Sequence, residues 1–406
     1  MPLAILALAI SAFGIGTTEF VMMGLLPNVA GDLGTSVPTA GYLVSAYALG
    51  VVVGAPLLTG LGARIPRKRM LLLLMGLFTV GNAASAVAPG YWTLLAGRFL
   101  AGLPHGAFFG VGAVVASRLV AEERRARAVA AMFLGLTTAN IVGVPAATAL
   151  GQHLGWRATF LVVAAVGLLA LGALALLIPR LPAEEHTGVA QELRALRQPQ
   201  VLLALLTAVF GFAGVFAVYS YLASMMTEVT GFADSSVTLL LALFGIGMTL
   251  GALAAGPLTD RALRPTLYGS LAALALVLVA FHYAARSKEA APFAVVMLGA
   301  VGFLTTTPLQ MLVMNKARRA PTLASASNHS AFNLANAGGA WLGGVAISAG
   351  WGWTSPALVG AVLAVAGLGI AITAGVLDQR TPTASSQIVA GRASLRPEPV
   401  GGVAAE

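Results

Sequence analysis

The chain has 406 residues, of which 58% are hydrophobic and only 9% are charged, and its net charge is +9. A soluble domain carries roughly 25% charged residues, so this composition cannot cover a water-facing surface. The absence of cysteine excludes disulfides and thiolate metal sites. The basic residues fall between apolar runs and do not gather into a nucleic-acid-binding face.

Apolar runs of about 20 residues, each long enough to cross a bilayer as a helix, follow one another along the chain. Six begin near Leu3, Thr39, Met70, Tyr91, Ala126 and Arg157, and six more near Val201, Ser235, Thr266, Pro292, Leu323 and Trp353. We therefore predict an all-α integral membrane protein with twelve transmembrane helices in two six-helix halves. The predicted parts are the first half (1–178), a cytoplasmic linker (179–200), the second half (201–377) and a disordered cytoplasmic tail (378–406).

The basic residues also predict the orientation of these spans. Of the 23 Lys and Arg, only Arg157, Arg286 and Lys288 fall on one side of the predicted bilayer, and Arg98 lies inside a span. All the others fall on the opposite side, and the side rich in Lys and Arg is the cytoplasmic one. Both termini are therefore expected inside the cell.

The two predicted halves resemble each other in sequence. Gly155-Trp156 recurs as Gly352-Trp353, and Ala139-Asn140 recurs as Ala335-Asn336, at nearly the same separation along the chain. Such a duplication predicts two pseudo-symmetric halves with a central cavity where they meet.

Three charged residues are candidates for proton coupling. Among the acidic residues, Glu19 alone sits well inside an apolar run. A carboxylate there is energetically costly unless it is protonated, paired or faces a water-filled cavity, so Glu19 is a functional candidate. The alternative is a structural acid that is hydrogen-bonded to a neighbouring helix. Asp32 is the second choice, because it is expected to mark the outer end of the first span. Arg98 needs an anionic or carbonyl partner, and the alternative for it is an arginine that pins helices by bonding backbone carbonyls.

Polar and adaptable side chains within the spans are candidates for the substrate cavity. In the eleventh span, three of them form a stripe at i, i+4 and i+7, which would be costly against lipid. Methionine and aromatic side chains adapt to irregular apolar ligands, although packing inside the bundle is the alternative for each of them. The full set is Met22, Met23, His105, Asn140, Tyr219, Phe244, His329, Asn333 and Asn336.

Several segments carry a family resemblance. They are Gly16-Thr17-Thr18-Glu19-Phe20 with Leu25-Leu26-Pro27, Arg98 with Gly102, and Gly143-Val144-Pro145 with Gly155-Trp156-Arg157-Ala158-Thr159-Phe160. From Leu3 to Leu377 the chain resembles the major facilitator superfamily, and within it the drug:proton antiporter group that includes chloramphenicol-efflux and arabinose-efflux-like proteins. The resemblance implies the major facilitator fold, a proton-coupling role for Arg98, and an antiporter motif in which Gly143 packs closely and Pro145 bends the helix.

The superfamily's loop signature, Gly-x-x-x-Asp-Arg-x-Gly-Arg-Arg/Lys, occurs twice in altered form. In the first half, Ala63 stands where the family usually has Asp. An Asp at such a helix end can pair with Arg and hold two helices in one of two packings, which implies a conformational latch; the alternative is that the basic residues only fix topology. The residues that fit the signature are Arg64, Arg67 and Lys68 in the first half and Gly256, Asp260, Arg261 and Arg264 in the second.

The resemblance implies proton-coupled efflux of small amphipathic compounds, such as phenicol-type antibiotics, across the bacterial cytoplasmic membrane. A sugar or metabolite exporter or facilitator of the same fold is the alternative. An intramembrane enzyme is a more distant one, because the chain has no cysteine nucleophile, no His-Glu-x-x-His and no Gly-x-Ser-x-Gly motif. We expect a monomer in the lipid bilayer that is driven by the proton gradient, with no cofactor, metal or nucleic acid.

Overall fold

The computed structural model describes residues 3–62, 64–179, 198–316 and 321–380, and every regular element in these ranges is helical. The first half comprises α1 (Leu3–Asp32), α2 (Val37–Leu61), α3 (Arg67–Ala86), α4 (Tyr91–Gly102), α5 (His105–Arg118), η1 (Glu122–Arg124), α6 (Arg125–Thr138), η2 (Ala139–Gly143), α7 (Val144–Leu154) and α8 (Trp156–Leu177). The second half comprises α10 (Pro199–Tyr219), α11 (Leu222–Glu228), α12 (Asp234–Arg261), α13 (Leu263–Ala284), α14 (Ala290–Leu304), α15 (Thr306–Lys316), α16 (Pro321–Ser348) and α17 (Ser355–Arg380).

Within the described ranges, eleven helical segments are long and apolar enough to cross a membrane. Some of these spans are broken: α4 and α5 form one span interrupted before His105, and α6, η2 and α7 form another. The helix α16 is 28 residues long and lies in the bundle beside them, but its asparagines lower its mean hydropathy, so it is not among the eleven. Together with α16 these segments form the all-α membrane bundle that the sequence predicts.

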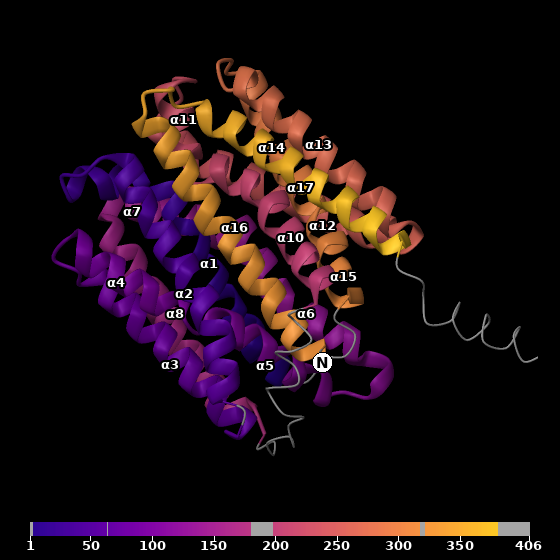
Figure 1. The fold of residues 1–406 in the computed structure, drawn as a ribbon. Helices are drawn as coiled ribbons and strands as arrows, with labels where there is room; N and C mark the ends of the chain where they lie inside the picture. The colour runs from indigo at the N-terminus through magenta and orange to yellow at the C-terminus, as the bar shows by residue number, and fades with distance from the viewer. Residues whose placement is uncertain (1–2, 63, 180–197, 317–320, 381–406) are drawn as a thin grey trace, which may run out of the picture.

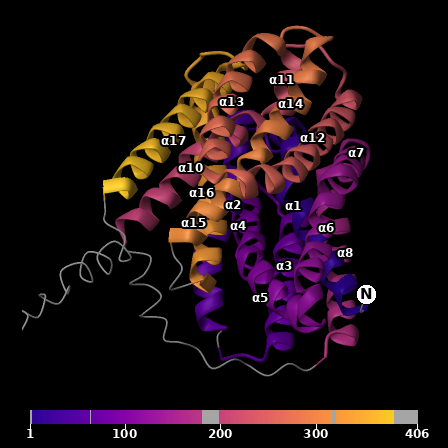
Figure 2. The ribbon, with the colours of Figure 1, turned by 90° about the vertical axis from the view of Figure 1, so that its right-hand side faces the viewer.

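The two halves lie side by side in both views (Figures 1 and 2). They meet where α2 packs against α16, where α7 and η2 pack against α12, and where α1 packs against α11. In Figure 1, α16 runs lengthwise between the helices of the first half and α10. The residues of α1 and α16 are therefore placed where the halves can contact each other.

Hydrogen bonds join the halves toward the end of the bundle where α1 finishes at Asp32, which we call the Asp32 end. Gln152 Nε2 donates to the carbonyl of Asp234 over 3.2 Å, and Ser45 Oγ donates to the carbonyl of Ala337 over 3.0 Å. The Tyr221 ring, at the break between α10 and α11, lies against Gly41 of α2. The halves are in contact at this end of the bundle.

The predicted boundary of the tail needs a correction. The sequence predicts a tail that begins at Asp378, but α17 continues through this residue to Arg380. The Asp378 side chain pairs with Arg264 and Lys316 of the second half. Residues 381–406 and 180–197 lie outside the described residues, as does Ala63, so the predictions of a disordered tail and a cytoplasmic linker are not tested there.

Candidate functional site

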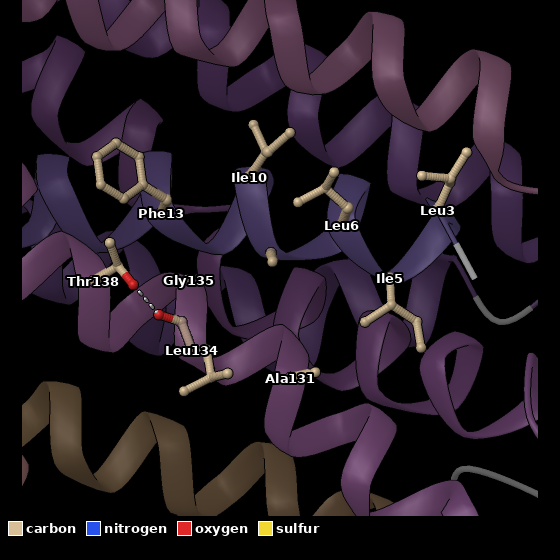
Figure 3. A pocket seen from close by; sticks show the side chains of 10 residues that line it. Leu3, Ile5, Leu6, Ile10, Phe13, Ala131, Leu134, Gly135 and Thr138 are labelled. Atoms are coloured by element: carbon tan, nitrogen blue, oxygen red, sulfur yellow. Dashed lines mark hydrogen bonds between the residues drawn. The ribbon is translucent and has the colours of Figure 1, made fainter. Parts of the chain in front are cut away.

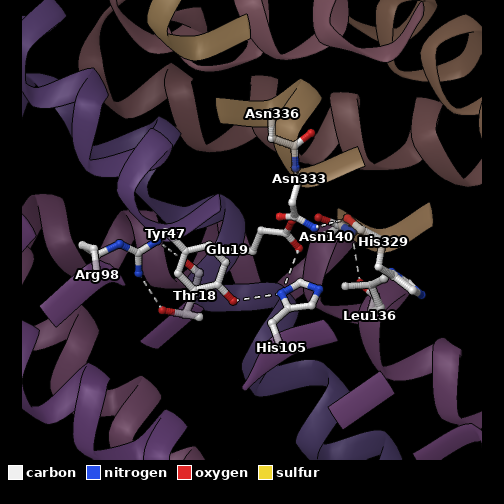
Figure 4. Close-up of polar contacts among 10 residues, drawn as sticks. All are labelled: Thr18, Glu19, Tyr47, Arg98, His105, Leu136, Asn140, His329, Asn333 and Asn336. Atoms are coloured by element: carbon white, nitrogen blue, oxygen red, sulfur yellow. Dashed lines mark hydrogen bonds and ion pairs between the residues drawn. The ribbon is translucent and has the colours of Figure 1, made fainter. Parts of the chain in front are cut away.

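The carboxylate of Glu19 lies in the interior of the bundle, where only 8% of the residue is exposed. Asn336 of α16 donates from Nδ2 to Glu19 Oε1 over 3.4 Å, so a group of the second half reaches an acid of the first. His105 Nδ1 lies 4.0 Å from Glu19 Oε2 on the other side. Figure 4 shows Glu19 between these two side chains.

Arg98 is fully buried, and its partners belong to the first half. Its Nη1 donates to Thr18 Oγ1 over 3.0 Å, and its Nη2 donates to the Thr18 carbonyl over 2.9 Å. The Thr18 hydroxyl in turn donates to Asn82 Oδ1 over 2.5 Å. Arg98 therefore has a carbonyl partner, one of the two partner types predicted for a basic residue inside a span, and it is held at the residue next to Glu19.

Tyr47 connects the arginine to the histidine. The guanidinium carbon of Arg98 lies 4.5 Å from the centroid of the Tyr47 ring, a favourable arrangement of a cation over an aromatic face. The Tyr47 hydroxyl and His105 Nδ1 share a hydrogen bond of 3.0 Å. A continuous series of polar contacts therefore runs from Asn82 to Thr18 and on through Arg98, Tyr47 and His105 towards Glu19. Figure 4 shows its members from Thr18 onwards.

The predicted polar stripe of α16 faces the interior of the bundle. Asn333 and Asn336 are 3% and 4% exposed. His329, one turn earlier, stacks on Phe109 of α5 with ring centroids 6.1 Å apart, and Phe109 stacks on Phe133 of α6. The stripe thus contacts the first half through His329 and Asn336, and its lining of a substrate cavity stays a prediction.

Asn140 lies in a π turn, η2, within the fifth span, and only 5% of it is exposed. Pro145 follows two residues after this turn and has no amide hydrogen to give to a helical hydrogen bond. A Cβ at Gly143 would come within 2.9 Å of the Phe13 ring of α1. Gly143 of the antiporter motif thus lies at the end of the π turn and at a close contact with α1, and Pro145 lies just after the turn.

Asp32 does not join the Glu19 group. It ends α1, 13 residues and therefore roughly 20 Å of helix beyond Glu19. Its Oδ2 accepts from Arg157 Nη1 over 2.5 Å and from Trp156 Nε1 over 3.0 Å, and its side chain is 47% exposed. These contacts fasten α1 to α8 at a distance from the Glu19 group, and a proton-coupling role for Asp32 stays a prediction.

The apolar candidates are packed between the halves. Met22 and Met23 are fully buried in a hydrophobic cluster that contains residues of both halves. Tyr219 stacks on Phe244 with centroids 3.9 Å apart, and Phe20, the neighbour of Glu19, contacts the Tyr219 ring edge-on. In this conformation the four candidates Met22, Met23, Tyr219 and Phe244 pack inside the bundle, which is the alternative to a role in binding substrate.

The first set of latch residues lies where α3 begins. Arg67 is 7% exposed, whereas Arg64 is exposed. Lys68 Nζ donates to the Ala175 carbonyl of α8 over 2.6 Å. The Lys68 contact lies within the first half.

In the second set, the expected Asp–Arg pair is not formed in this conformation among the described residues. Asp260 is exposed and forms no ion pair among the described residues, and Gly256 and Arg261 lie near it on the same helix end. Arg264 Nη2 instead pairs with Asp378 Oδ2 over 2.6 Å, and Lys316 donates to the other oxygen of Asp378. Asp378 therefore joins α13, α15 and α17.

Sequence reasoning missed Thr18, Tyr47 and Asn82 as members of the polar network, and Asp378 as an ion-pair partner. Asn82 is fully buried, and its place inside an apolar run was a signal of the same kind as that of Glu19. Tyr47 and Thr18 gave no such signal, because tyrosine and threonine are ordinary residues in membrane helices.

A cavity of about 570 Å³ lies elsewhere, between the start of α1 and α6 (Figure 3). Its lining is apolar apart from Thr138, whose hydroxyl donates to the Leu134 carbonyl of its own helix. Leu3, Leu6 and Leu134 on its walls are more than half exposed. This cavity has the character of a lipid contact and contributes no charged or unpaired polar group.

Comparisons with known proteins agree with this architecture. The family model described as Major Facilitator Superfamily matches residues 8–340 and, a second time, 226–403. The chain is 47% identical over 360 residues to "Inner membrane transport protein YdhP" of Escherichia coli, covering 89% of this chain and 92% of that protein.

Two further relatives have names that state a substrate. The "Chloramphenicol resistance protein" of Streptomyces lividans is 35% identical, over 90% of this chain and 96% of its own length. The "Probable sugar efflux transporter" of Helicobacter pylori is 30% identical, over 84% and 87%. With its helical membrane bundle and these matches along most of its length, the chain belongs to the Major Facilitator Superfamily of membrane transporters.

Proposed function

We propose that this transporter exports small amphipathic compounds in exchange for protons, with Glu19 as the group that takes up and releases the proton. The observation that carries this proposal is the contact between buried Glu19 and Asn336, which links an ionisable group of one half to the other half. The relatives named for chloramphenicol resistance and for sugar efflux support export as the direction of transport.

The surroundings of Glu19 suit a reversible proton site. Arg98 is committed to Thr18, so it places positive charge near the carboxylate without forming a fixed ion pair with it. A charged acceptor makes a stronger hydrogen bond than a neutral one, so protonation of Glu19 weakens its bond from Asn336. Protonation then loosens a contact between α1 and α16, and loss of the proton restores it.

Alternating access follows from this coupling. The halves touch near the Asp32 end, and opening that end requires α1 and α2 to move relative to α16. Once that end is open, Glu19 takes up a proton from the outside, which keeps the α1–α16 contact weak and favours departure of the exported compound. Release of that proton to the cytoplasm, as the next compound binds from there, completes one exchange. We place the transporter in a bacterial cytoplasmic membrane with both termini inside.

The experiment uses purified protein in proteoliposomes, with chloramphenicol as the probe and an imposed pH gradient as the driving force. We expect Glu19→Gln to abolish gradient-driven chloramphenicol movement, because the amide cannot exchange a proton. The matched control is Glu289→Gln, an exposed acid in the turn before α14, which should transport as the wild type does. Gradient-driven transport by Glu19→Gln with the wild-type pH dependence would exclude this role.

A sugar exporter or facilitator of the same fold is the second candidate, favoured by the similarity to the Helicobacter pylori protein. A facilitator equilibrates its substrate and cannot concentrate it. Accumulation of a test sugar against its gradient only when a pH gradient is imposed identifies an exporter, and equilibration independent of pH identifies a facilitator.

A further inference from the structure

Three asparagine side chains near Glu19 present unpaired carbonyl oxygens. Asn140, Asn333 and Asn336 are each at least 95% buried, and no described residue donates a hydrogen bond to Oδ1 of any of them. Buried polar atoms in proteins are almost always paired, so unpaired ones require an explanation. Figure 4 shows the three amides close to the Glu19 carboxylate.

The hydrogen bonds of each amide nitrogen determine which amide atom is left without a partner. Asn140 Nδ2 donates to the Leu136 carbonyl over 3.1 Å, and Asn333 Nδ2 donates to the His329 carbonyl over 3.0 Å. Asn336 Nδ2 donates to Glu19 over 3.4 Å. Only the nitrogen of an amide can donate to a carbonyl or a carboxylate, so the oxygen must be the atom left over in each case.

The three oxygens come from both halves: Asn140 from η2, and Asn333 and Asn336 from α16. They and Glu19 form a set of acceptors, and His329 stacked on Phe109 adds an aromatic surface one turn away. A ligand that matches this set carries several hydrogen-bond donors beside an aromatic or apolar part.

We propose that Asn140, Asn333 and Asn336 form a substrate site selective for neutral compounds with several hydroxyl or amide N–H donors, such as aromatic diols and sugar derivatives. Water satisfies the three oxygens when no substrate is bound, and a substrate that donates replaces that water without loss. A compound that only accepts leaves the buried oxygens unpaired and is rejected. This inference rests on the proposed transport function and specifies the chemistry of its substrate.

The test measures binding to purified protein at constant pH, without a gradient, by ligand-induced change in tryptophan fluorescence. The probes are two matched pairs: chloramphenicol and its diacetate, and isopropyl thiogalactoside and its tetraacetate. Acetylation of a hydroxyl keeps the acceptors and removes the donor. We expect at least one donor-bearing member to bind, and its acetylated partner to bind at least about tenfold more weakly for each essential donor lost.

Variants connect this preference to the asparagines. Asn333→Leu keeps a similar volume and removes one acceptor, so it should reduce the preference for the donor-bearing compound about tenfold. The control is Thr207→Val in α10, a buried hydroxyl that already donates to the Leu203 carbonyl of its own helix, and it should keep the preference. Thermal unfolding without ligand provides a separate readout: Asn333→Leu should be about as stable as the wild type, because the amide oxygen that it removes is paired only with water when no substrate is bound.

The proposal is overturned if the acetylated compounds bind as well as their parents, if no donor-bearing probe binds, or if Asn333→Leu keeps the wild-type preference. A clear loss of stability in Asn333→Leu would instead show that the amide is a structural group. Since no gradient is used, the preference can hold even if Glu19→Gln shows that transport is not coupled to protons, so failure of the two proposals is distinguishable.

Discussion

The hydroxyl of Thr18 holds the buried Arg98 in place, and this predicts a large difference between two neighbouring threonines. Thr18→Val removes a hydroxyl that accepts from Arg98 Nη1 and donates to Asn82 Oδ1. Both partners stay buried and lose a bond, which costs about 1–3 kcal/mol for each. The free energy of unfolding should therefore fall by about 2–6 kcal/mol.

Thr17→Val is the matched control. The Thr17 hydroxyl donates only to the Phe13 carbonyl one turn earlier, a group that the helix already satisfies, so its loss should change stability by about 0.5 kcal/mol or less. Unfolding in mixed micelles by added sodium dodecyl sulfate, followed by fluorescence of the five tryptophans, measures both variants. Equal stability of the two variants would refute the view that the Thr18 hydroxyl bridges the arginine and the asparagine.

Three further predictions concern the rest of the bundle. Cysteines introduced at Ser287 and Thr187 should react with a membrane-impermeant reagent from opposite sides of the membrane; reaction of both from the outside would reverse the predicted orientation. Asp378→Asn should lower transport activity and thermal stability more than Asp260→Asn, because Asp378 holds both Arg264 and Lys316, and equal tolerance would argue against that cluster. Gly41→Ala should hold the halves apart at the Asp32 end, because its Cβ would overlap the Tyr221 ring and hydroxyl, and transport should recover in the double variant with Tyr221→Ala. Failure of that second change to restore transport would show that the defect has another cause.

The sequence predicted which residues are unusual better than it predicted their partners. Glu19 and Arg98 were recognisable because an ionisable group is costly inside an apolar run, and that cost is readable from a linear sequence. The partners of Arg98 in α1 and of Arg264 in α17 lie 80 and 114 positions away, and only the packing of helices brings them together.

The same distinction explains the other discrepancies. Asp32 resembles Glu19 as an acid next to an apolar run, but its place at the helix end lets Arg157 and solvent reach it. The stripe of α16 was readable from its helical spacing, whereas the side to which it turns depends on α5 and α6, which helical spacing does not specify. The same asparagines lower the mean hydropathy of α16, so the buried polar side chains of that helix weaken the pattern by which a membrane span is recognised in a sequence.

The π turn η2 also sets the rotational phase of the fifth span. Added Cβ atoms at Gly135 and Gly143 would both meet α1, at Ala9 and at Phe13 and Thr17. Eight residues of regular α-helix overshoot two full turns by about 80°, whereas seven residues complete very nearly two. The π turn accommodates one extra residue without the rotation that this residue would add to a regular α-helix. Gly135 and Gly143 therefore face the same neighbour. Deleting Val142 would therefore return the segment to a regular helix with the same face towards α1. The number of residues in this span can thus change by one without changing which face contacts α1.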